Sequence, residues 1–298
     1  MGHERVAGNG EADERQRAMA LVGQLGSYAG LKRPMAGWVS PVFKTWIGRA
    51  RAGHDLVEVA KSGMTGLIGR PALIEALHDL DAKLGADEEG SEHFALELER
   101  AKAQAALVAK EVERDFPLLH GLTCVWLWSA LETLVEDLLV AALQNDDRLA
   151  ASEELRDIRV PIAAAASGDR EVLARTVYRE LEVKKGAGFR AGVSRFEGLL
   201  NLLDLGGSVP EDHRRALYEL SSVPNVILHR GSAIDVAFLD ACPWFGAKVG
   251  EELRVQSWRL EGYSAACIGY VAMLMARFGD RYPPNAADLE RAKEPTAG

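Results

Sequence analysis

The most apolar segment of the chain runs from Leu118 to Leu143 and reads LLHGLTCVWLWSALETLVEDLLVAAL. It is too long for a β-strand, and its apolar residues surround the helical circumference instead of forming a single stripe. Such a helix is stable in water only when other helices cover it. The segment therefore predicts the central helix of a bundle, with Trp126 and Leu131 in its core.

Helical spacing also recurs on both sides of this segment. Leu73, Ile74, Leu77, Leu80 and Leu84 share one apolar face. We predict helices over residues 54–84 with a break near 69–71, and over 101–115, 152–159, 170–184, 189–205, 211–220 and 256–278. No alternating pattern of convincing length indicates a strand. The predicted class is all-α, a helical bundle with an N-terminal helical extension.

The composition along the chain predicts four regions. Residues 1–17 are polar and contain glycine, which is typical of a disordered terminus. We expect an N-terminal helical region over 18–115, the helical bundle over 116–282 and a loose tail over 283–298. The longest charge-free runs, 116–131 and 262–276, are shorter than the roughly 20 apolar residues of a membrane span, so no membrane contact is expected.

The charge and cysteine content exclude some classes of protein. Lys and Arg number 35 and Asp and Glu 44, so the net charge is −9, and the overall field does not attract nucleic acid. Cys124, Cys242 and Cys267 are widely spaced, which argues against a disulfide framework or a zinc knuckle. The N-terminus shows no signal peptide. We therefore expect a cytoplasmic protein.

Common cofactor motifs are missing from the sequence. It contains no G-x-x-x-x-G-K-[ST] phosphate-binding loop and no G-x-S-x-G nucleophile elbow. Glu75 and His78 form one E-x-x-H pair, whereas a di-iron bundle requires two such pairs and two further glutamates. We expect no metal and no cofactor.

One part of this acidic chain is locally basic. Residues 184–230 contain seven Lys and Arg against five Asp and Glu, a balance of +2. The basic residues are Lys184, Lys185, Arg190, Arg195, Arg214, Arg215 and Arg230. Such a stretch is either a modest footprint for a polyanion or ordinary surface charge.

A polar pair stands out within residues 218–244, which read YELSSVPNVILHRGSAIDVAFLDACPW. Pro224 suits the first position of a helix, because its fixed φ fits there and no N–H is needed. Asn225 and His229 then lie side by side at i and i+4. Residues 226–228 are expected to face the core, and Gly231 to end the helix. The pair is a candidate functional site.

This segment resembles the HEPN superfamily, the small helical domains of many bacterial toxins, defence proteins and RNA-processing factors, and among them the RiboL-PSP-HEPN and MAE-like domains. The family motif is R-N-x-x-x-H, and Asn225, His229 and the following Arg230 look like it. Asp235 and Phe238 continue the pattern, and residues 128–132 (WSALE) look like the family's early core helix. The resemblance covers about residues 116–280 and implies a HEPN-like domain there.

In active members, the resemblance implies metal-independent RNA cleavage by a ribose 2′-hydroxyl. His229 would transfer the proton, Asn225 would orient the histidine or the phosphate, and Arg230 and Arg215 would bind phosphate. Glu132 would support the cleft from the central helix. The motif arginine is missing, since positions 222–224 hold Ser, Val and Pro. We therefore expect a weak or degenerate endoribonuclease, or a nuclease-dead RNA binder, in a defence or toxin–antitoxin context.

The main alternative is a non-catalytic helical scaffold, such as a dimerisation module or an immunity partner in a defence system. There Asn225 and His229 would only satisfy local hydrogen bonds. The resemblance also implies a homodimer with residues 224–229 near its two-fold axis, where the partner copy could supply the missing cation.

Overall fold

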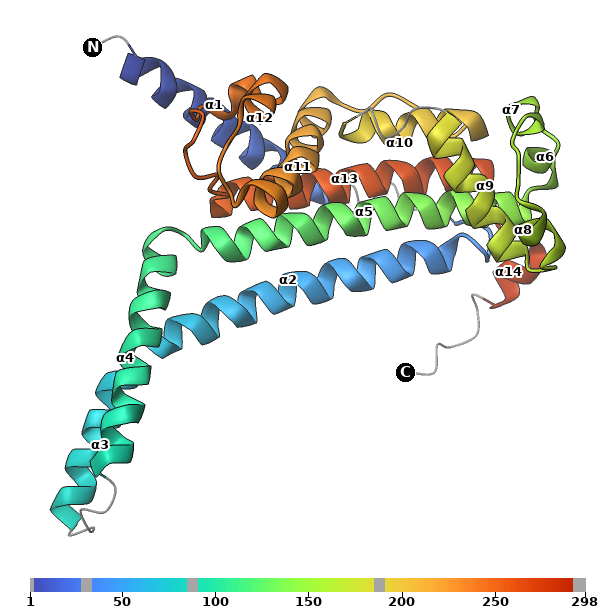
Figure 1. Cartoon of the computed structure of the whole chain (residues 1–298). Coiled ribbons are helices and arrows are strands. Elements are labelled where there is room, and N and C mark those ends of the chain that lie inside the picture. The colour runs from blue at the N-terminus through green and yellow to red at the C-terminus, as the bar shows by residue number, and fades with distance from the viewer. Residues whose placement is uncertain (1–2, 28–33, 85–90, 185–190, 292–298) are drawn as a thin grey trace.

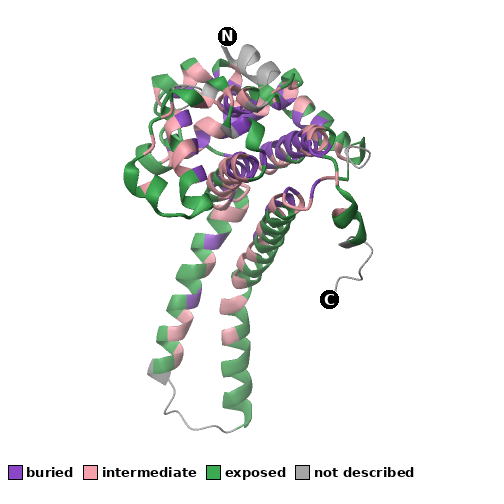
Figure 2. Cartoon of the chain, turned by 90° about the vertical axis from the view of Figure 1, so that its right-hand side faces the viewer, coloured by how far each residue is buried: buried purple, intermediate pink, exposed green. Residues whose placement is uncertain are grey.

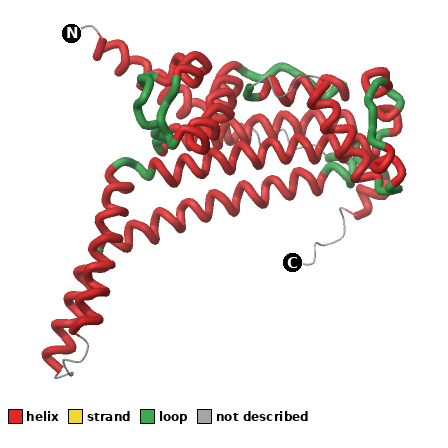
Figure 3. Tube along the Cα trace, viewed as in Figure 1, coloured by secondary structure: helices red, strands yellow, loops and turns green. Residues whose placement is uncertain are grey.

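The computed structural model describes residues 3–27, 34–84, 91–184 and 191–291, and these residues form an all-α protein (Figure 3). Their one β-type pairing is an isolated antiparallel bridge between Ala233 and Glu252. The helices form a body and a projecting two-helix arm (Figure 1). The predicted all-α class is confirmed.

The longer helices carry most of the structure. They are α1 (His3–Gly23), α2 (Ser40–Ile68), α3 (Arg70–Leu84), α4 (Ser91–Glu113), α5 (Pro117–Asn145), α9 (Arg170–Lys184), α10 (Val193–Leu200), α11 (Glu211–Arg230) and α13 (Ser257–Arg281). Shorter elements connect them: α6 (Asp147–Ala150), α7 (Glu153–Arg156), α8 (Ile162–Ala166), η4 (Asn201–Leu203), α12 (Val236–Ala241), η5 (Pro243–Phe245) and α14 (Ala286–Arg291). The break near 69–71 and the bounds of α9 agree with the prediction.

Helix α5 lies at the centre of the body and contacts α2, α9, α11 and α13. Leu131 and Leu138 on α5 are fully buried. However, α13 buries as many residues as α5 from a shorter helix, so the body has two central helices. Small residues on α13 permit this close packing; Gly262, for example, lies directly against Ala18 of α1.

Part of the α5 surface is less buried than expected. Trp126 is half-buried, and its ring lies against Gly53 of α2, where a side chain would collide with it.

Within the described chain, α5 is the one helix that is long and apolar enough to cross a membrane by length and composition. Half of its most apolar stretch is buried inside the protein.

The N-terminal region differs from the prediction. Residues 1–17 were expected to be disordered, yet α1 begins at His3 and lies along α13 (Figure 1). Ala18 and Leu21 are buried there. Because α1 and α2 both pack onto helices of the predicted 116–282 domain, residue 115 marks no boundary of the core. Contacts with α11 and α13, which are far away along the chain, hold this polar segment in place as a helix.

The arm is formed by α3 and α4, with the end of α2 at its base, and extends well away from the body (Figure 2). The His78 and Phe94 rings stack 3.8 Å apart, and Ala101 and Val108 of α4 are buried against the opposite helices. The arm is thus a narrow helical hairpin with little interior.

The C-terminal region 283–298 was expected to be a loose tail, but it contains helix α14. Asn285 and Asp288 cap this helix by reciprocal backbone-to-side-chain hydrogen bonds of 3.1 and 2.9 Å. Residues 292–298 lie outside the described residues.

Leu131→Ala tests the central position of α5. It removes fully buried methyl groups and should lower the free energy of unfolding by about 2–5 kcal/mol in urea titrations. Leu122→Ala is the control on the same helix, because Leu122 is half exposed; it should cost about 0.5 kcal/mol. Equal effects of the two variants would contradict this packing.

His120 gives the fold a pH dependence. Its ring is fully buried, its Nδ1 lies 2.8 Å from the Val255 carbonyl oxygen, and burial lowers the pKa of the imidazole. Burial also lowers the pKa of His213. The unfolded chain therefore takes up protons, below its ordinary histidine pKa of about 6.5, that the folded protein does not take up.

The free energy of unfolding should consequently fall as the pH is lowered from about 7.5 to about 5.5. His120→Gln should reduce this slope without abolishing it, since His213 still contributes. Urea titrations across the pH range would measure both slopes. Identical slopes in the wild type and the variant would exclude His120 as a source of the dependence.

Candidate functional site

Helix α11 carries the predicted site but differs from the expected form. It begins at Glu211 and continues without interruption through Pro224 to Arg230. Pro224 therefore lies inside the helix and does not begin it. A proline there has no N–H to donate to the Leu220 carbonyl, a loss that helices tolerate only with support. The packing of α11 against α5 and α13 supplies that support.

Asn225, His229 and Arg230 lie exposed near the end of α11. Gly231 ends the helix with a φ of 57°, as predicted. Arg230 already forms an ion pair with Asp235 at 3.2 Å. Leu228 was expected in the core and is instead exposed, because only one side of this last turn faces the body.

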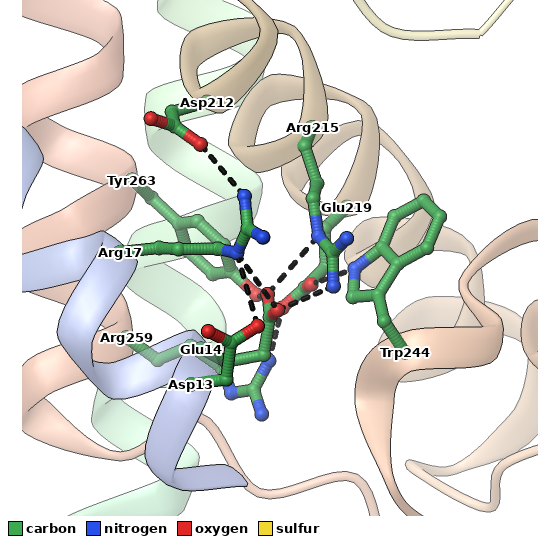
Figure 4. Close-up of polar contacts among 9 residues, drawn as sticks. All are labelled: Asp13, Glu14, Arg17, Asp212, Arg215, Glu219, Trp244, Arg259 and Tyr263. Carbon is green, nitrogen blue, oxygen red and sulfur yellow. Dashed lines mark hydrogen bonds and ion pairs between the residues drawn. The ribbon is translucent and has the colours of Figure 1, made fainter. Parts of the chain in front are cut away.

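Arg215 does not join this group. Fourteen residues separate it from His229 on the same helix, a distance of about 21 Å. Its guanidinium binds Glu14 of α1 and lies 4.4 Å from the centroid of the Trp244 ring (Figure 4). Arg215 was expected to bind phosphate, but its charge is neutralised by Glu14, away from His229.

Glu132 lies away from His229 as well. Ile227, near His229, packs onto Gly121 of α5, and Glu132 lies eleven residues further along α5, about 16 Å away. The Glu132 carboxylate accepts a hydrogen bond from Arg195, which also binds Glu182 at 2.9 Å. Burial raises the pKa of Glu132 and Arg195 opposes the rise. The residue is part of a network between α5, α9 and α10.

The locally basic stretch forms no free basic patch in the described chain. Each of its described Lys and Arg residues is paired with a carboxylate. The pairs are Lys184–Asp157, Arg195–Glu132, Arg214–Glu211, Arg215–Glu14 and Arg230–Asp235. Lys185 and Arg190 lie outside the described residues. Of the five candidate residues, only Asn225, His229 and Arg230 lie together.

A buried polar cluster around Glu219 was missed by the sequence reasoning (Figure 4). Glu219 is 2% exposed and Arg259 of α13 is 6% exposed. The Glu219 carboxylate accepts hydrogen bonds from Arg259, from the Tyr263 hydroxyl and, at 2.7 Å, from the Trp244 indole N–H. The only signal in the sequence was one acid between buried apolar positions of α11, at Leu217 and Leu220.

The charges in this cluster balance one another. Burial is the largest influence on the Arg259 guanidinium and opposes its charge, but Glu219 and Tyr263 together outweigh burial, so the pKa of Arg259 is raised. Burial raises the pKa of the neighbouring Glu14. Arg17 extends the cluster to the surface by binding Asp212 at 2.9 Å. The adjoining cavity has only about 30 Å³, room for about one water molecule, so the cluster holds helices together and leaves no space for a substrate.

A much larger cleft lies elsewhere, between α2, α5 and α13 and beside the end of α1. Its volume is about 570 Å³. Neither Asn225 nor His229 lines it. Among the described residues, no three His, Cys, Asp or Glu side chains gather as a metal site.

The fold and these sites define an all-α protein with a helical body and a projecting arm. Comparisons of the chain with protein-family models, curated proteins and solved structures find no match.

Glu219→Gln tests the role of the buried cluster. It removes the charge that compensates Arg259 and should lower the free energy of unfolding by about 3–5 kcal/mol in urea titrations at neutral pH. Glu211→Gln is the matched control on α11, because Glu211 is exposed; its effect should stay within about 0.5 kcal/mol. A neutral Glu219→Gln would show that the pair adds nothing to stability.

Proposed function

We propose that this chain is a non-catalytic helical scaffold that self-associates through its arm. The observation that carries the proposal is a row of leucines on α3. Leu73, Leu77, Leu80 and Leu84 are each between 51% and 75% exposed. Their spacing of four, three and four residues is that of a coiled-coil seam.

The hairpin of α3 and α4 is held together by contacts other than this row of leucines. Arg70 binds Glu97 at 3.2 Å, and Lys102 lies 3.6 Å from Glu75, so ion pairs already join α3 to α4. The stacked rings of His78 and Phe94 join the same two helices. Burying a leucine side chain contributes about 1.5–3 kcal/mol. Four exposed leucines on one helix therefore favour contact with a second copy.

The positions of the predicted catalytic groups favour the same function. Arg215 and Glu132 are held in separate ion pairs away from His229. Residues 222–224 offer no arginine. A HEPN-like chain that lacks its phosphate-binding cation fits a cytoplasmic dimerisation or immunity partner of a bacterial defence system better than a nuclease.

A second candidate function is directed at RNA. Asn225 and His229 are exposed, and neither has a hydrogen-bond partner among the described residues. In this alternative, a homodimer formed around residues 224–229 brings a cation from the partner copy to His229. The protein would then be a weak metal-independent endoribonuclease or a nuclease-dead RNA binder.

Light scattering of three variants separates the two functions. The scaffold function predicts a dimer at micromolar concentration, which Leu77→Glu combined with Leu84→Glu converts to a monomer by placing charges in the seam. Val249→Glu is the control on an exposed loop and should remain dimeric. A monomeric wild type would refute self-association. If Leu228→Glu dissociates the dimer and the double variant of α3 does not, the dimer interface lies on α11 and not on the arm.

An RNA-cleavage assay with EDTA present completes this test. The scaffold function predicts no cleavage by the wild type or by Pro224→Arg, which restores the family arginine and a backbone donor inside α11. Cleavage by the wild type that is abolished by His229→Ala, in a variant that keeps its melting temperature, would establish the RNA-directed function instead.

A further inference from the structure

The cleft between α2, α5 and α13 has the size and the depth of a small-molecule site. Its volume of about 570 Å³ lies within the range of about 300–1,000 Å³ that is typical of such sites. Core residues form part of its lining, namely Leu127 of α5 and Leu260, Ala265 and Cys267 of α13, each at most 8% exposed. The cleft therefore reaches the hydrophobic core of the body.

Two tryptophans give the cleft flat aromatic surfaces. Trp46 of α2 and Trp126 of α5 both line it. Trp46 is 6% exposed and its indole nitrogen is buried, so this residue offers a ligand ring carbons and no hydrogen-bond donor. Aromatic rings stack on one another, which adds to the gain from burying their area. The lining thus favours a molecule that contains rings.

The charges of the cleft cancel among the described residues. Arg51 and Lys61 of α2 are positive, whereas Glu58 of α2 and Glu261 of α13 are negative. Lys61 also lies 3.6 Å from Glu58. Because neither sign is in excess, a charged ligand would leave water for a lining with no net opposite charge, and such a transfer is costly. The balance favours an uncharged ligand.

Two hydroxyl groups of the lining are already hydrogen-bonded within the protein. Thr123 donates to the Leu119 carbonyl oxygen at 2.7 Å, and Ser257 donates to the Asp115 carboxylate at 2.6 Å. A well-held water molecule needs two to four polar partners, which a mainly apolar lining does not supply. A ligand that replaces poorly held water by apolar surface gains affinity.

We propose that this cleft binds an uncharged, mainly apolar molecule that contains rings. The rings lie against Trp46 and Trp126, and the rest of the apolar surface lies against Leu260 and Ile268. The inference does not depend on the proposed scaffold function, because the leucine row of α3 lies elsewhere in the fold.

Fluorescence titration with N-phenyl-1-naphthylamine, an uncharged molecule with three aromatic rings, tests the proposal directly. The expected result is saturable binding of one molecule per chain. The matched probe is 1-anilinonaphthalene-8-sulfonate, which has the same rings and an added negative charge. It should bind at least about tenfold more weakly. Equal or tighter binding of the sulfonate, or binding of many molecules per chain, would overturn the proposal.

Substitutions in the walls of the cleft locate the site. Ala50→Trp fills the cleft and should weaken binding of N-phenyl-1-naphthylamine at least tenfold, whereas Ala52→Trp, exposed and outside the cleft, should not. Ile268→Glu places a charge in the cleft at a position that is 40% exposed, and it should have the same effect. Val236→Glu on α12 is its exposed control. With folding verified by circular dichroism, unchanged affinity in both cleft variants would refute the site.

Light scattering distinguishes this ligand from a second copy of the chain in the cleft. Ile268→Glu should keep the mass of the wild type, and the Leu77→Glu, Leu84→Glu double variant should keep its affinity for N-phenyl-1-naphthylamine. If Ile268→Glu lowers the mass and the wild type binds no dye, the cleft is a contact between copies and the proposal is wrong. Loss of dye binding in the double variant would place the dye on the arm and also contradict the proposal.

Discussion

Helix α5 constrains the whole body, because it is apolar on nearly every side. A helix with one apolar stripe needs one neighbour, whereas α5 must be surrounded. The chain meets this requirement with α2 from its N-terminal part and α9, α11 and α13 from its C-terminal part. For this reason the N-terminal helices belong to the same core as the later ones, and no independent domain begins after residue 115.

The Glu219–Arg259 pair is the main polar feature inside this apolar body. It links α11 to α13, and Glu14 and Arg215 extend the link to α1. A buried pair of this kind adds little stability in itself, but losing one partner is costly. The network also has a consequence for function. It engages Arg215, which was expected to bind phosphate together with Arg230.

Among the described residues, apolar surface is uncovered along the leucine row of α3 and in the cleft beside α2. Contiguous exposed apolar surface is typical of binding and association sites. The His229 surface, by contrast, is small and polar, and Arg230 beside it is already paired. The geometry thus favours binding and association over catalysis, and it separates two sites that can be tested independently.

The sequence by itself determined the all-α class, the central apolar helix, the bounds of α9 and the break at Gly69. These features follow from spacing along the chain, which sets local structure. It also placed Asn225 and His229 on one helix face. The tertiary structure alone decided the order of α1, the continuity of α11 through Pro224, the partners of Arg215 and Glu132, and the cleft. Each of these depends on contacts between residues far apart in the chain, and such contacts outweigh local preferences without leaving a periodic signal.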